Sequence, residues 1–439
     1  MNIRKVLALL LTLVLCMSAL AGCGGEKPAA EEKAPEQAET TTPEAPEATG
    51  DNIIKVGLVF PTSGASASPG QINIWGITDY FQYYNEKGGI QSLGGAQIVW
   101  EVRDTESAAD VAVSAAESVI GDESISAMMG TYNSGTMSAV QPVAAKYNMP
   151  TMGVNSVGSY CYVTENECVA HVVSTDQQDL PATADFYKVL KEEYGVETAM
   201  LALDNSELAT NNRIFLHTAM ERAGIEIIGE EVFNANASDF STIVQKIKSN
   251  DPDFVVCQMN ANDAVLFTQT MAEYDVSTLV QGMGVGFSDP TYLDAVGDLA
   301  ENVLCSGYYF SSALDSAQDP ELAKQFADKH KNERGIEINE PYAVGWTAAA
   351  VLVDAFERAA STDREAIAKA LMETNIPYEH EANLFYNYPS ITFEDFECEN
   401  GDFVYNQNPN PSLMLAQYQD GVFNVVFPEA SAVADVRVG

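Results

Sequence analysis

Basic residues and histidines are scarce in this chain. Its 439 residues include 22 Lys and Arg against 63 Asp and Glu, for a formal net charge of −41, and only four histidines. A nucleic-acid-binding protein needs basic surface to displace counterions from phosphates, so this charge excludes nucleic acid as a partner. Attraction to anionic lipid headgroups is excluded for the same reason.

The motifs of common catalytic and metal sites are also missing. The chain contains no Gly-x-Ser-x-Gly elbow, no phosphate-binding loop and no His-Glu-x-x-His segment, and the region around Gly57 lacks a dinucleotide fingerprint. No cysteine spacing is typical of zinc, and the histidines are scattered, at positions 171, 217, 330 and 380. We therefore expect neither catalysis, nor a metal site, nor a cofactor.

The first residues predict an export signal. Two basic residues precede a stretch that is almost wholly apolar from Val6 to Leu15 and that ends in Leu20-Ala21-Gly22-Cys23. The run is too short and ends too abruptly for a membrane span, which disfavours an uncleaved anchor helix. The final tetrapeptide resembles a bacterial lipobox. This resemblance implies that residues 1–22 are a signal peptide and that Cys23 is lipidated after cleavage.

A tether follows the cysteine. Residues 24–50 are rich in Glu, Ala, Pro and Thr and contain no aromatic residue and no aliphatic residue larger than Ala. Such a segment cannot bury enough apolar surface to offset its ordering entropy. We interpret residues 23–50 as the lipidated cysteine and a flexible, acidic, Pro-rich tether that holds the folded body, from Asp51 onward, off a membrane.

Five cysteines remain in the body. Cys161 and Cys168 are close together in a polar segment, and an oxidising compartment would permit a disulfide between them. Cys257 and Cys305 lie in apolar, strand-like runs and are predicted to be small core residues, whereas Cys398 lies in an acidic turn.

The body alternates between predicted strands and helices, and the pattern restarts near residue 198. Such alternation indicates parallel sheets with helices on both faces, so we expect two α/β units. The predicted strands are 53–60, 98–102, 125–129, 150–154, 198–203, 225–231, 254–258 and 279–281, the predicted helices include 74–84, 107–120, 137–147, 212–223, 320–334, 342–360 and 363–374, and residues 413–426 are predicted to form a hairpin around Asp420-Gly421.

Ligands of open parallel sheets bind beyond the carboxyl ends of the strands. The richest loop there is Gly130–Thr136, which offers Tyr132, Asn133, Ser134 and Gly135 just before a helix. Hydroxyls and a helix N-terminus together suit a carboxylate or another anionic group. The alternative is an ordinary N-cap turn. A neighbouring loop, residues 155–159, adds further hydroxyls.

Several short segments carry a resemblance to a known family through their order and spacing. They are Ile54-Lys55-Val56-Gly57-Leu58, Thr62-Ser63-Gly64, Asn85-Glu86-Lys87-Gly88-Gly89-Ile90, Asp239-Phe240-Ser241, Asp251-Pro252-Asp253-Phe254-Val255, Tyr342-Ala343-Val344-Gly345-Trp346 and Gln419-Asp420-Gly421. With these segments, over roughly residues 53–428, the chain resembles the leucine/isoleucine/valine-binding protein family of periplasmic receptors.

The family's fold implies two doubly wound α/β domains joined by three crossovers, the type I periplasmic-binding-protein architecture, closing on a ligand between them. On this basis we expect an N-terminal lobe from residues 51–174 plus 307–390. The C-terminal lobe is expected from residues 175–306 plus 391–439.

The resemblance also implies ligand-binding positions. Ser134 matches a serine that holds the ligand carboxylate after the third strand. Ser156, or Val157 if the alignment shifts by one, matches the position after the fourth strand. Asp176 matches an acidic residue near the first crossover. The remaining candidate ligand-binding residues are Tyr132, Asn133, Gly135, Asn260 and Gly284.

Three departures from the family concern its ammonium-binding side. Gly284 stands where amino-acid binders often carry a glutamate, and Leu208 and Pro69 stand where they carry tyrosines. A buried ammonium without a partner is costly, so another carboxylate is required if the ligand is an amino acid. Amides, urea-like solutes and other small carboxylates stay open, and the candidate carboxylates are Asp176, Glu207, Asp263 and Asp289.

The resemblance predicts an extracytoplasmic, membrane-anchored lipoprotein. It would capture a small polar ligand, a branched-chain or other amino acid, and deliver it as a monomer to the permease and ATPase subunits of an ABC importer. The alternatives to this function are a receptor for an amide or urea and a ligand-sensing module that feeds a signalling partner.

Overall fold

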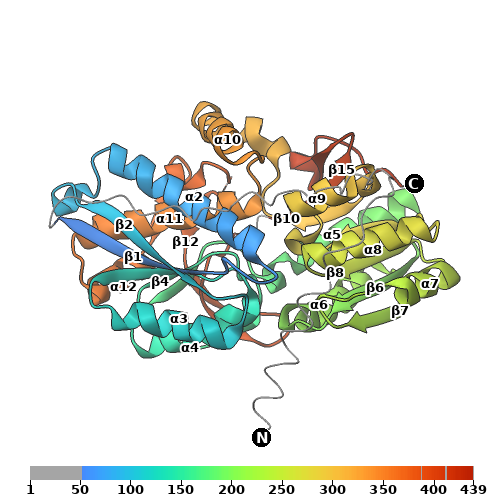
Figure 1. Ribbon diagram of the computed structural model, residues 1–439, viewed down its shortest axis with the longest axis horizontal. Coiled ribbons are helices and arrows are strands. Elements are labelled where there is room, and N and C mark those ends of the chain that lie inside the picture. The colour runs from blue at the N-terminus through green and yellow to red at the C-terminus, as the bar shows by residue number, and fades with distance from the viewer. Residues whose placement is uncertain (1–51, 387, 411–412, 439) are drawn as a thin grey trace, which may run out of the picture. The chain divides into compact units, whose positions relative to one another are not determined.

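The computed structural model describes residues 52–386, 388–410 and 413–438, so the predicted signal peptide, Cys23 and the tether up to residue 50 lie outside the described residues. The described part of the chain forms two seven-stranded sheets and one two-stranded sheet. Both large sheets lie within one compact unit (Figure 1). Within the described ranges, no helix combines the length and apolar character that crossing a membrane requires.

The first sheet and its helices form the first lobe. Its strands are β1 (Ile53–Phe60), β2 (Gln97–Asp104), β3 (Ile125–Gly130), β4 (Thr151–Gly153), β5 (Val169–His171), β13 (Glu394–Glu397) and β14 (Phe403–Gln407). Its helices are α2 (Ala67–Glu86), α3 (Ala109–Gly121), α4 (Ser134–Lys146), α10 (Pro320–Arg334), α11 (Glu340–Ala359) and α12 (Arg364–Met372). The strand order is β13-β14-β5-β4-β3-β1-β2.

Alternation along β1 shows how this sheet is covered. Val56, Leu58 and Phe60 pack with residues of α2 and α11, whereas Val59 packs with α3 and α4 on the opposite face. Figure 1 shows these two helix pairs on either side of the strands. Because successive side chains of a strand point to opposite faces, both faces of β1 must be apolar, as its sequence is.

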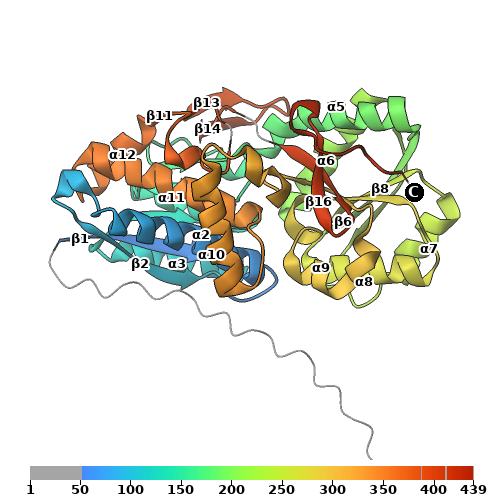
Figure 2. The same ribbon diagram turned by 90° about the horizontal axis from the view of Figure 1, so that it is seen from above.

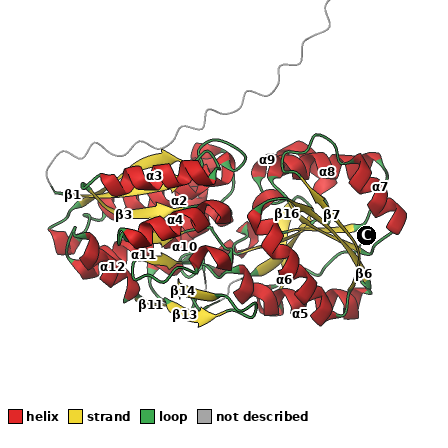
Figure 3. Cartoon of the chain, turned by 90° about the horizontal axis from the view of Figure 1, so that it is seen from below, coloured by secondary structure: helices red, strands yellow, loops and turns green. Residues whose placement is uncertain are grey.

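The second sheet has the same construction. Its strands are β6 (Thr198–Asp204), β7 (Glu226–Phe233), β8 (Phe254–Gln258), β9 (Leu279–Gly282), β10 (Leu304–Gly307), β15 (Met414–Gln419) and β16 (Val422–Phe427), in the order β16-β15-β10-β9-β8-β6-β7. Its helices are α5 (Asp176–Tyr194), α6 (Glu207–Ala223), α7 (Ser241–Asn250), α8 (Ala261–Glu273) and α9 (Pro290–Val296). Figure 3 shows the strands between α7 to α9 and α5 with α6.

The expected fold class is therefore confirmed: two α/β lobes with mostly parallel sheets, joined by three crossovers. The crossovers lie between β5 and α5, between β10 and α10, and between β14 and β15. The predicted hairpin around Asp420-Gly421 forms as β15 and β16, and α4 begins at Ser134 and continues through Pro142.

The third crossover lies later than the boundary at residue 391 predicted from the sequence. β14 pairs with β5 through Gln407 and His171, and β13 pairs with β14, so residues 394–407 complete the first sheet (Figure 2). This pairing covers the edge that β5 would otherwise expose. The strongly acidic β13 then forms the new edge of the sheet.

One buried carboxylate holds α10 onto the first lobe. Asp79 of α2 is only 2% exposed and accepts two bonds from the Arg334 guanidinium, at 3.0 and 3.1 Å. Lys329 Nζ lies 3.0 Å from the same carboxylate and the Tyr342 hydroxyl lies 2.8 Å from it. Figure 2 shows α10 crossing α2. Three donors from α10 and α11 thus converge on one anion.

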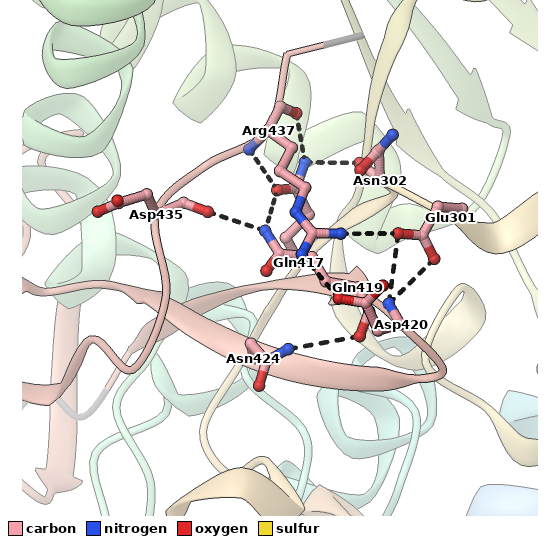
Figure 4. A network of polar contacts seen from close by, with 8 residues as sticks. All are labelled: Glu301, Asn302, Gln417, Gln419, Asp420, Asn424, Asp435 and Arg437. Atoms are coloured by element: carbon pink, nitrogen blue, oxygen red, sulfur yellow. Dashed lines mark hydrogen bonds and ion pairs between the residues drawn. The ribbon is translucent and has the colours of Figure 1, made fainter.

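Two glutamines hold the C-terminal residues against the β15–β16 hairpin (Figure 4). Gln417 exchanges two hydrogen bonds with the backbone of Arg437, at 2.7 and 2.8 Å, and Gln419 donates to the carbonyl of Asp435 at 2.8 Å. The Arg437 guanidinium contacts Glu301 at 3.1 Å and Asp420 at 2.7 Å. Both glutamines are buried, so this strap satisfies polar groups inside the second lobe.

Candidate functional site

The site begins at the N-terminus of α4, directly after β3. The N-cap residue, Asn133, makes no side-chain cap bond, and its amide instead donates to Ser66 Oγ at 2.8 Å. The first N–H groups of a helix have no partner within it, and the helix dipole adds positive potential there. The start of α4 can therefore accept an anionic group from outside the helix.

Ser134 lies at this helix start and is 4% exposed. Its Oγ accepts the backbone N–H of Gly158 at 3.1 Å. A hydroxyl has one hydrogen to donate in addition to its lone pairs, so Ser134, whose side chain also neighbours those of Tyr160 and Cys161, could donate to an oxygen of a ligand. The same contact joins the loop after β3 to the loop after β4.

Ser156 supports these loops from behind. Its side chain is fully buried, and its hydroxyl donates to the carbonyl of Thr131 at 2.7 Å. Thr131 and Thr136 extend the same buried hydroxyl network at 2.7 Å. Of the two positions predicted after the fourth strand, Ser156 holds the loop together, and Val157 is the one with exposed surface.

Asp176, the first residue of α5, faces the same loop. Its Oδ1 accepts the N–H of Ser159 at 2.9 Å and that of Gln177 at 2.8 Å, which leaves Oδ2 for a donor of a ligand. Burial raises the pKa of this carboxyl to about 6, against the hydrogen bonds, which lower it. Burial also raises the pKa of Tyr160, to which Glu207 and Asp176 both contribute.

The second lobe brings Glu207 to the start of α4. A Cβ placed on Gly135 would lie 3.5 Å from Glu207 Oε2, so the small residue at 135 leaves room for this carboxylate. Glu207 is exposed and begins α6. Two carboxylates, Asp176 and Glu207, therefore lie near the predicted carboxylate-binding loop, and neither forms an ion pair with a Lys, Arg or His of the part of the chain that the structure describes.

Gly284 adopts a left-handed conformation, with φ of +68°. Side chains other than glycine rarely adopt that conformation, which explains why a glutamate does not stand here. Another acidic residue of the same loop reaches the first lobe. Asp289 caps α9 through Thr291 and accepts the Ser68 hydroxyl at 3.0 Å, and burial raises its pKa.

Asp263 and Asn260 form hydrogen bonds within the second lobe. Asp263 accepts the N–H groups of Asn236 and Ala237, both at 2.8 Å, and the Asn260 amide at 2.7 Å. Asn260 in turn caps α8. These contacts occupy the oxygens of Asp263, and those of Asp289 are likewise occupied by Thr291 and Ser68, which leaves Asp176 and Glu207 as the better placed of the four carboxylates.

The remaining predicted positions frame this region. Tyr132 is partly exposed, and burial raises its pKa, with Glu340 and Asp289 contributing. Glu340 was not predicted from the sequence. It begins α11 and binds both the second crossover and Asn155 of the loop after β4. No local sequence signal distinguishes it from an ordinary acidic residue in the first turn of a helix.

The disulfide that the sequence left possible between Cys161 and Cys168 is absent from this structure, in which both are free thiols. The Cys161 thiol donates to the carbonyl of Ser134 at 3.1 Å, and the Cys168 thiol points to that of Ala144 at 3.7 Å. Those carbonyls lie ten residues apart on α4, about 15 Å along the helix. Sulfurs directed to points so far apart cannot form a bond of about 2 Å.

We therefore expect two free thiols in the unreduced protein. Burial raises the pKa of Cys168 to about 12 and that of Cys161 well above its usual value, so alkylation of the native protein should be slow. Unfolding without reductant should allow each cysteine to take up one alkyl group, measured by peptide mass spectrometry. Recovery of a Cys161–Cys168 cross-linked peptide would contradict this arrangement.

Comparison with known proteins identifies the family of the chain. The periplasmic binding protein family model matches residues 53–394. A Leu/Ile/Val-binding protein homolog from Brucella abortus is 25% identical over 88% of this chain and 94% of its own length.

Solved structures share the fold. The branched-chain amino acid transporter substrate-binding protein LivJ from Streptococcus pneumoniae, in complex with isoleucine, matches with a TM-score of 0.70, 19% identity, and coverage of 86% of this chain and 100% of that one. A solute-binding protein from R. palustris, in complex with benzoate, matches with a TM-score of 0.69, 20% identity, and coverage of 88% and 99%. With a family model that spans most of its length, the chain belongs to the periplasmic binding protein family.

Proposed function

We propose that this protein captures a small amino acid between its two lobes and delivers it to an ABC importer. The observation that carries the proposal is the start of α4, where Ser134 keeps a hydrogen to donate and the N-cap side chain is turned away. This arrangement suits a carboxylate, which would gain charge-assisted hydrogen bonds there. The named relatives and the isoleucine-bound neighbour support the same ligand class.

A partner for the α-ammonium is the second requirement. Asp176 is our choice because it is buried, lies beside the loop after β4, and has one oxygen outside its local hydrogen bonds. Glu207 approaches the same helix start from the second lobe. These two carboxylates would bind the ammonium in place of the glutamate that is absent at Gly284.

The ligand class can be tested by screening amino acids, amides, urea and benzoate by thermal shift and measuring the affinity of those that bind by calorimetry. We expect leucine, isoleucine or valine to raise Tm of the purified body, with smaller or no shifts from the corresponding amides. Benzoate is the informative comparison, because a structural neighbour binds it and it carries a carboxylate without an ammonium. A response to benzoate or to urea and amides, with none to amino acids, would overturn the amino-acid assignment.

We also propose that the protein is anchored outside the cytoplasm by a lipid on Cys23. Cys23→Ser should leave uncut precursor and abolish incorporation of labelled fatty acid, because the thiol is the site of lipidation. Cys16→Ser, inside the apolar run, is the matched control and should mature normally. Normal cleavage and labelling of Cys23→Ser would contradict the anchor.

A further inference from the structure

The loop after β4 is held by carboxylates at both of its ends. At one end, Asn155 Nδ2 donates to Glu340 Oε1 at 3.1 Å. At the other end, the N–H of Ser159 donates to Asp176 Oδ1 at 2.9 Å. Between them lie Val157, which has exposed surface, and Gly158, which binds Ser134. The conformation of the proposed carboxylate-binding loop therefore depends on these two anchors.

The Glu340 anchor also holds the second crossover. Its Oε2 accepts the backbone N–H of Tyr308, the first residue after β10, at 2.7 Å. A Cβ on Gly307 would lie only 2.6 Å from the same oxygen, so a larger residue there would displace the Glu340 carboxylate from this position. One carboxylate of the first lobe thus binds the loop through one oxygen and the crossover through the other.

Tyr308 is held from the second lobe as well. Its hydroxyl donates to Asp179 Oδ2 at 2.6 Å, and Asp179 also accepts the Ser174 hydroxyl at 2.7 Å. Asp179 lies in α5, one turn after Asp176, which anchors the other end of the loop. These hydrogen bonds form a closed ring that runs from the loop through Glu340, Tyr308 and α5 and back to the loop.

We propose that Glu340 is a positioning residue that couples the loop at residues 155–159 to the second crossover between the lobes. The loop expected to contact the ligand and this crossover would then move together. This inference rests on the proposed function, because the loop is the one expected to contact the ligand. A movement of the second crossover would therefore change the conformation of the binding loop through Glu340, which does not itself contact the ligand.

The ionisation of Glu340 provides a signature of this role. Burial raises its pKa to about 7, while its bonds to Tyr308 and Asn155 lower it. The folded protein therefore takes up a proton here as the pH falls through about 7. The titratable groups whose pKa values respond to Glu340 are Tyr132, Asp179, Cys305, Tyr308 and Tyr386, and the pKa of Asp179 is itself raised to about 7 by burial.

The test is hydrogen–deuterium exchange on the ligand-free protein, read at residues 155–159 and 308–310. At pH 8, Glu340→Gln should accelerate exchange at both segments by about tenfold or more, because the amide offers one acceptor oxygen in place of two. At pH 6, the difference between variant and wild type should shrink, because wild-type Glu340 is then mostly neutral. Comparison at equal pH cancels the intrinsic dependence of exchange on pH.

Two further variants keep the result interpretable. Glu365→Gln removes an exposed carboxylate in the first turn of α12 and should change neither segment. Asn155→Ala removes the link from Glu340 to the loop, together with the bond that Asn155 Oδ1 accepts from Asn73 at 2.6 Å, and leaves the bond between Glu340 and Tyr308 in place. It should loosen residues 308–310 as well, which carries the test if Glu340→Gln does not fold. Faster exchange at one segment alone, or a difference that does not vary with pH, would overturn the coupling, and neither result depends on the identity of the ligand.

Discussion

Replacement of Ser134 by Ala should weaken amino-acid binding by about one to two decades in Kd. The hydroxyl is placed to donate to a ligand carboxylate, and a charge-assisted bond of that kind contributes about 1.5–3 kcal/mol. The substitution also leaves the N–H of Gly158 without its acceptor, which should lower the free energy of unfolding by about 1–3 kcal/mol. Calorimetry with leucine or isoleucine and thermal melts of the ligand-free protein measure the two effects.

Thr136→Val is the matched control for Ser134→Ala. Thr136 lies in the same turn, is buried, and donates to the carbonyl of Asn133 at 2.7 Å, so its loss should also lower Tm. Its hydroxyl belongs to the network behind the loop, and Kd should therefore change less than threefold. If both variants lower Tm and neither changes Kd, Ser134 is only part of the loop's internal support.

Replacement of Asp79 by Asn should have the largest effect on stability, about 3–5 kcal/mol. The carboxylate is buried, and its loss leaves Lys329 without its anion and the Arg334 guanidinium with only the longer contact to the half-exposed Glu333, at 3.5 Å. Removal of one partner from a buried ion pair costs more than the pair contributes, because the other charge remains desolvated. Tm of the ligand-free protein should fall by roughly 4–6 °C in a thermal melt, because the entropy of unfolding grows with chain length.

Asp328→Asn is the control that distinguishes the loss of this buried pairing from the loss of one negative charge. Asp328 also lies on α10 and pairs with Lys324 at 3.6 Å, but its side chain is 59% exposed. Exposed pairs contribute at most about 1 kcal/mol. Equal shifts in Tm for the two variants would contradict the view that Asp79 fastens α10 to the first lobe.

The alternation of strands and helices was predictable because burial on both faces leaves a strong local pattern. β1, α10 and the hairpin at Asp420-Gly421 each carry such a pattern, as an apolar run, a helical period or a turn dipeptide. β13 was not predicted as part of the first sheet. It is an edge strand with three acidic residues, and its place is fixed only by pairing with β14, which no local pattern reveals.

The site was predictable to the level of loops. Ser134 could be named because a strand, a small-residue loop and a helix start follow one another in the sequence. The sequence could not decide between Ser156 and Val157 as the binding position, because the choice depends on which side chain turns toward Thr131.

The sequence could not decide on the disulfide for a related reason. Cys161 and Cys168 are near in sequence, but each thiol is directed at a different turn of α4.

The strap at residues 435–437 has a consequence for synthesis. β10 is complete at Gly307, but its neighbour β15 starts at Met414, and the strap that secures β15 and β16 lies later still. At about 5–20 residues per second, a ribosome needs roughly 6–26 s to make the segment from Gly307 to Arg437. During that interval β10 is an open edge, and a nascent chain with an open edge can pair with another copy. Aggregation of the newly made protein should therefore increase with the time between the synthesis of β10 and its pairing with β15.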